Sequence, residues 1–228
     1  KGTCAATVVR EMEQRFQEAG FEKLPLSEAW NLQEGGAYYV VIHETSCLAF
    51  RVGETRRQAP YFRVVSAHTD QPGFRLKPEP ELEKGHSSKL NVNVYGGPIY
   101  STWMDRPLSL AGKVAVRSPR LFETDVRVVD LVRPLLVIPN LAIHMNREVN
   151  RGVELNPQVD MQPLAGLDLS EHFVREALCE TLGVEAEAIL DYDLFAYNVD
   201  APTITGWKGE FLSSPRLDDL VMVSAAME

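Results

Sequence analysis

Hydrophobic positions near the start of the chain recur first with the period of a helix and then with that of strands. Val9, Met12 and Phe16 share one helical face, and Gly20 follows where a helix would end. We therefore predict a packing helix over residues 3–19. Apolar and β-branched runs after it predict four strands, at residues 38–42, 48–52, 61–67 and 74–77.

The middle of the chain has a different pattern of hydrophobic and polar residues. Leu90, Val92 and Val94 alternate with Asn91 and Asn93, which is typical of a half-exposed antiparallel strand. Further strands are predicted at residues 108–116, 124–130 and 135–138. The change from a helix-led opening to successive strands predicts an α/β or α+β protein with a second, β-rich domain.

The last third of the chain predicts two more helices. Residues 168–171 form a capping-box pattern before a helix that runs to Gly183. Residues 194–198 predict a strand. Residues 213–220 read as a helix entry, with serine at the cap and proline in the first turn. Because both ends of the chain are abrupt, we expect it to be a piece of a longer protein.

Composition excludes several classes of function. The chain has 228 residues, a net charge of −9 and no basic cluster, which argues against binding of nucleic acid or of an anionic membrane surface. No stretch of ~18 uninterrupted apolar residues predicts a membrane span. The three cysteines are far apart in the sequence, so disulfides and a thiolate zinc site are not expected, which is consistent with the cytoplasm.

Candidate chemistry lies at the end of the predicted strand 61–67. His68 follows this strand and Asp70 comes two residues later, a pattern that suits a metal ligand and the carboxylate that orients it. Asp218 lies in the first turn of the last predicted helix. The helix dipole alone would favour an acidic residue there, but a carboxylate could also bridge two metal ions. His144 alone reads as a core or loop histidine.

Four segments in one order resemble the aspartyl aminopeptidase family of zinc metallo-aminopeptidases. They are residues 66–72, 95–114, 138–144 and 214–220, and the second holds the distinctive Trp103-Met-Asp105-Arg106 block. The resemblance covers about residues 60–228. It implies a zinc-dependent aminopeptidase that removes N-terminal residues, often Asp or Glu, from peptides by two-metal hydrolysis.

The resemblance also implies an architecture. The fold would be α/β, with a mixed-sheet catalytic domain interrupted by a β-rich oligomerisation domain. We place the first part of the catalytic domain at 1–92, the insert at 93–191 and the resumed catalytic domain at 192–228. Family members self-associate into tetrahedral dodecamers, so a large homo-oligomer is expected.

Individual residues match the family pattern position by position. His68 matches a metal-ligating histidine, Asp70 the catalytic aspartate that supports it, and Asp218 the carboxylate shared by two divalent ions, most simply Zn. His144 matches a histidine that reaches the substrate site of a neighbouring subunit. The sequence departs from the pattern at three positions, with Gln71 for serine, Pro98 for glycine and Asp219 for asparagine.

The other ligands and the general base of this pattern would lie beyond residue 228. The 228 residues alone are therefore expected to bind zinc poorly and to lack activity. Two alternatives stay open at this point. One is a related co-catalytic zinc hydrolase, such as a carboxypeptidase or deacylase, and the other is a catalytically inactive assembly protein of the same fold.

Overall fold

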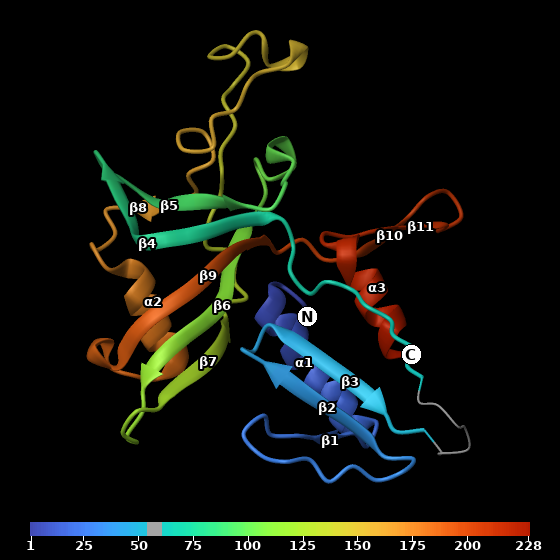
Figure 1. Ribbon diagram of the computed structural model, residues 1–228. Helices are drawn as coiled ribbons and strands as arrows, with labels where there is room; N and C mark the ends of the chain where they lie inside the picture. The colour runs from blue at the N-terminus through green and yellow to red at the C-terminus, as the bar shows by residue number, and fades with distance from the viewer. Residues whose placement is uncertain (54–60) are drawn as a thin grey trace. The chain divides into compact units, whose positions relative to one another are not determined.

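The computed structural model describes residues 1–53 and 61–228, which form two compact units (Figure 1). The first unit comprises residues 1–71 and 216–228, and the second comprises residues 72–215. Both units combine strands with helices, so the predicted α/β class is confirmed. Within the described ranges, no helix is both long and apolar enough to cross a membrane.

The first unit has a three-stranded sheet and two helices. Its elements are α1 (Ala5–Glu18), β1 (Glu22–Lys23), β2 (Ala37–Ile42), β3 (Ser46–Arg51) and α3 (Leu217–Met227). Strand β2 is central, parallel to β1 and antiparallel to β3. Phe16, from the predicted apolar face of α1, packs against Phe21 and Tyr39. These aromatic contacts pack α1 against β2.

Buried Thr7 secures the start of α1. Its hydroxyl accepts hydrogen bonds from the backbone N–H groups of Thr3 (2.8 Å) and Cys4 (2.9 Å) and donates to the Cys4 carbonyl. Thr7→Val keeps the shape but removes this acceptor, and it should lower the free energy of unfolding by about 1–3 kcal/mol. Chemical denaturation checks this, with Thr181→Val on an exposed helix position as a near-neutral control. Equal effects of both changes would contradict the prediction.

The second unit is built on one six-stranded sheet. Its strands are β4 (Gly73–Lys84), β5 (Ser87–Tyr95), β6 (Leu108–Arg117), β7 (Thr124–Asp130), β8 (Leu164–Leu167) and β9 (Ile189–Asn198). Their order is β7-β6-β9-β4-β5-β8, and these neighbours pair antiparallel. Helix α2 (Phe173–Leu182) contributes Val174 and Leu178 to the core on one sheet face, with Phe74, Leu90 and Leu194.

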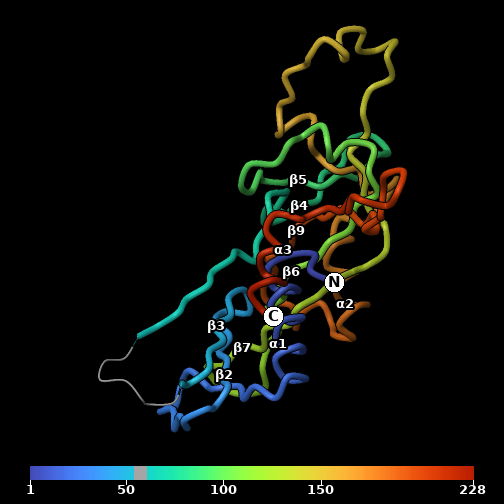
Figure 2. Tube along the Cα trace, turned by 90° about the vertical axis from the view of Figure 1, so that its right-hand side faces the viewer, coloured from blue at the N-terminus to red at the C-terminus, as the bar shows by residue number. Residues whose placement is uncertain are grey.

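Smaller elements complete this unit. They are the hairpin β10 (Thr203–Thr205) and β11 (Phe211–Ser213), and the 3-10 helices η1 (Tyr100–Thr102), η2 (Val149–Arg151) and η3 (Ala186–Ala188). Between β7 and β8, residues 139–163 leave the sheet as a long excursion, which both views show in yellow and gold (Figures 1 and 2).

Several predictions about secondary structure were wrong. Helix α2 begins after His172 without a side-chain cap, so residues 168–171 are not the predicted capping box. Residues 61–67 form no strand, and Phe62 and Val64 are 88% and 80% exposed, because no described strand pairs with them. Residues 135–138 make isolated bridges rather than a regular strand. Strand β4 continues beyond residue 77 because a register shift against β5 accommodates its two prolines.

The compact units divide the chain at other points than the predicted domains. The predicted boundary at 92/93 falls inside β5, and the one at 191/192 falls inside β9. Both strands belong to the six-stranded sheet, so neither predicted boundary separates the two compact units. The domain boundaries 1–92, 93–191 and 192–228 stay a prediction.

Candidate metal centre

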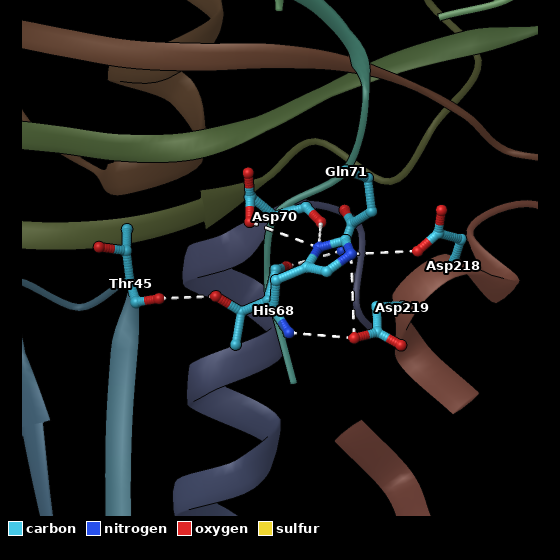
Figure 3. A network of polar contacts seen from close by, with 7 residues as sticks. Thr45, His68, Asp70, Gln71, Asp218 and Asp219 are labelled. Carbon is cyan, nitrogen blue, oxygen red and sulfur yellow. Dashed lines mark hydrogen bonds and ion pairs between the residues drawn. The ribbon is translucent and has the colours of Figure 1, made fainter. Parts of the chain in front are cut away.

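The first unit brings together one histidine and two aspartates from distant parts of the chain. Nε2 of His68 lies 3.0 Å from Oδ1 of Asp218 and 3.8 Å from Oδ2 of Asp219 (Figure 3). One candidate ligand atom from each of the three side chains lies within 4.8 Å of the others. Imidazole nitrogen and carboxylate oxygen are donors that zinc accepts. The donor set therefore fits a divalent metal ion.

Asp70 contacts the ring of His68 mainly through its backbone. Nδ1 of His68 lies 2.8 Å from the Asp70 carbonyl oxygen and 3.5 Å from its carboxylate Oδ1. When Nδ1–H donates to the carbonyl, the lone pair of the neutral ring is on Nε2, which faces Asp218. The contact expected from the sequence was with the carboxylate, whereas the shorter contact is with the main chain.

The loop that carries His68 is fixed by polar contacts on both sides. The Thr69 hydroxyl donates to the carbonyl of Thr45, in the turn between β2 and β3, at 2.7 Å (Figure 3). The Gln71 side-chain amide donates to the Thr69 carbonyl at 2.7 Å. These bonds limit the positions that the histidine can take.

The two aspartates lie at the irregular start of α3. Arg216 precedes the helix in a left-handed conformation (φ 64°), and its Nε donates to the Gly2 carbonyl at 3.0 Å. Asp218 has non-helical angles (φ −87°, ψ 109°). This differs from the predicted serine and proline cap, because the chain turns at Arg216. Successive carboxylates consequently leave the chain in different directions.

The oxygen acceptors around His68 raise its pKa above the ordinary value of 6.5. The largest cause is the hydrogen bond to the Asp70 carbonyl; loss of water opposes it, and Asp218 and Asp219 add to it. The protonated ring therefore stabilises the metal-free fold below pH ~6.5, and this contribution is lost as pH rises through the raised pKa. Since a metal ion must displace the proton on Nε2, metal binding should strengthen over the same rise in pH.

Histidine NMR titration of the metal-free protein checks this shift. We expect the His68 midpoint above 6.5 and a lower midpoint in Asp218→Asn, which removes one negative charge beside the ring. The same ring measured in the denatured protein provides the reference. A folded-state midpoint at or below the denatured one would contradict the prediction.

One predicted site residue belongs to the other compact unit, and one member of this group was not predicted from the sequence. His144 belongs to the second unit, at an exposed turn within the excursion 139–163. Its role stays a prediction, as do those of His68, Asp70 and Asp218. Asp219 was noted in the sequence as the neighbour of Asp218 in the first turn of the last predicted helix and as a departure from a family pattern, but not as a site residue. The adjacent acidic pair was the available signal, but it did not distinguish the two carboxylates.

Comparison with known proteins covers nearly the whole chain. The model of the family described as "Aminopeptidase I zinc metalloprotease (M18)" matches residues 2–228. The "Probable M18 family aminopeptidase 2" of Clostridium novyi is 41% identical over 100% of this chain and 54% of its own length. The chain thus spans about half the length of this curated relative.

Known structures agree with the family match. The chain resembles one in the "Cryo-EM structure of the Ape4 and Nbr1 complex", with a TM-score of 0.92, 28% identity and coverage of 98% of this chain and 47% of that one. The S. cerevisiae mApe1 dodecamer shares the fold, with a TM-score of 0.77, 22% identity and coverage of 98% and 52%. The chain belongs to the M18 family of zinc metalloproteases, which includes the aspartyl aminopeptidases.

Proposed function

We propose that the full-length protein is a metal-dependent aminopeptidase that releases N-terminal residues from peptides. The observation that carries this proposal is the approach of His68 to Asp218, 150 residues later, in a chain of the M18 family. Zinc peptidase sites combine imidazole and carboxylate ligands of this kind. The proposed preference for acidic N-terminal residues rests on the family resemblance alone.

The proposed site holds two divalent ions, most simply Zn. Asp218 is the proposed shared ligand, and its side chain is 86% exposed, so both carboxylate oxygens are accessible. His68 is the proposed ligand to one ion, and Asp70 keeps its ring oriented. Such ions would polarise the scissile carbonyl and lower the pKa of a bound water.

The proposed assembly is a large homo-oligomer acting on peptides. His144 would contact substrate in a neighbouring subunit, and its exposed position in the excursion 139–163 is compatible with that role. One matched structure is a dodecamer, which supports the same state here. We also propose a cytoplasmic location, with which three cysteines present as thiols are consistent.

Metal analysis and a substrate panel on the full-length protein test the proposal. We expect about two ions per subunit, hydrolysis of Asp-, Glu- or Leu-aminoacyl reporters, and loss of activity with a chelator that added zinc reverses. Trimming of peptides only from the C-terminus would favour a related zinc hydrolase. Less than about one ion per subunit, without turnover, would favour an inactive assembly protein.

A further inference from the structure

The adjacent carboxylates at the start of α3 occupy unlike environments. The side chain of Asp218 is 86% exposed, whereas that of Asp219 is only 17% exposed. Since Asp218 has non-helical angles, the two side chains do not share one face of the helix. Figure 3 shows Asp218 facing the ring of His68 and Asp219 lying toward its main chain. Because their environments differ, we expect the carboxylates of Asp218 and Asp219 to have different roles.

Asp219 contacts the backbone of the proposed metal ligand. Its Oδ2 accepts a hydrogen bond from the His68 backbone N–H at 3.1 Å, across 151 residues of sequence. The same oxygen lies 3.8 Å from Nε2 of the ring. A hydrogen bond from a peptide N–H to a carboxylate is charge-assisted and stronger than a neutral one. One side chain therefore holds the peptide of His68 against the start of α3 and also lies close to its ring.

The local structure makes this bond consequential. Among the described residues no strand pairs with residues 61–71, so within this part of the chain side-chain contacts hold His68. The loop depends instead on side-chain bonds, from Thr69 to the Thr45 carbonyl on one side and from the His68 N–H to Asp219 on the other. Metal affinity depends on ligands that are already held in place before the ion binds.

We propose that Asp219 is a positioning residue, which fixes His68 against Asp218 through the backbone hydrogen bond and is not itself a metal ligand. The inference rests on the proposed metal site. It assigns the neighbouring acids separate roles, with Asp218 binding metal and Asp219 setting the spacing of the two ligands. An amide oxygen could accept the same hydrogen bond, whereas a methyl group could not.

Two substitutions in the full-length protein separate these roles. Asp219→Asn keeps the acceptor but loses its charge, and it should lower zinc affinity by less than about 10-fold, below the range typical of a lost supporting group. Asp219→Ala removes the acceptor and should weaken zinc affinity by about 10–100-fold, the effect typical of groups that support a ligand. Competition with a chromophoric chelator measures affinity. Activity of Asp219→Ala should recover as zinc is raised, because the chemistry of bound metal does not involve this side chain.

Controls make each outcome decisive. Asp168→Ala, at another aspartate beside a histidine ring (His86), should change neither affinity nor activity. Asp219→Asn and Asp219→Ala losing affinity equally would overturn the inference in favour of a direct ligand, and neither losing affinity would overturn it outright. If Asp218→Ala also kept full zinc content and activity, the proposed site itself would fail.

Discussion

Replacing His68 with glutamine in the full-length protein is expected to lower zinc affinity, and kcat/KM for the proposed aminopeptidase reaction, by more than about 100-fold. That is beyond the 10–100-fold range typical of groups that only support a ligand. Glutamine retains a polar side chain of similar reach but lacks the imidazole nitrogen that faces Asp218 at 3.0 Å. Metal content after dialysis and hydrolysis of an aminoacyl reporter measure the two effects.

His86→Gln is the matched control for this prediction. His86 is exposed, pairs with Asp168 at 2.9 Å and belongs to the second unit, whereas the proposed ligands belong to the first. Its replacement should leave zinc content and kcat/KM within about twofold, because surface ion pairs contribute little. Retention of stoichiometric zinc and normal turnover by His68→Gln would exclude His68 as a ligand.

The second large effect is expected in the core of the six-stranded sheet. Gly112 on β6 lies opposite Leu194 on β9, and a Cβ there would overlap the backbone oxygen of Asp193. Gly112→Val should therefore force β6 and β9 apart and destabilise the protein by about 3 kcal/mol or more. Backbone atoms cannot turn aside as a flexible side chain can, so little relaxation is available.

Thermal unfolding of the full-length protein checks the Gly112 prediction. A loss of this size corresponds to a lower midpoint by about 2–4 °C per kcal/mol for a domain of about 150–250 residues. Gly97→Val is the control, because nothing lies within 4 Å of a Cβ built at Gly97. An unchanged midpoint for Gly112→Val would show that the two strands can separate at little cost.

Strands that carry their own period were predictable from the sequence. Leu90 and Val92 are buried on one face of β5, as their alternation with asparagines predicted. The run around Val64 was not, since an apolar segment becomes a buried strand only when another strand pairs with it. Periodicity describes a segment's preference, while pairing depends on partners elsewhere in the chain.

The candidate site was less accessible to sequence reasoning than the strands. Spacing alone offered His68 and Asp70 as neighbours, but the approach of Asp218 across 150 residues came only from the family resemblance. The separate environment of Asp219 depends on the backbone angles of Asp218 and on the turn at Arg216, which no pattern of residue types specifies. The approach of Asp218 to His68 and the environment of Asp219 both depend on the tertiary structure.

The first unit contains two segments that are far apart in the sequence, and this sets the order in which they can meet during synthesis. Residues 72–215 must leave the ribosome before Arg216 can reach the Gly2 carbonyl and before Asp218 can meet His68. The second unit is continuous in sequence, so its strands can pair before α3 has been synthesised. The nascent chain would thus gain its paired histidine and carboxylate only after the intervening sheet has been made.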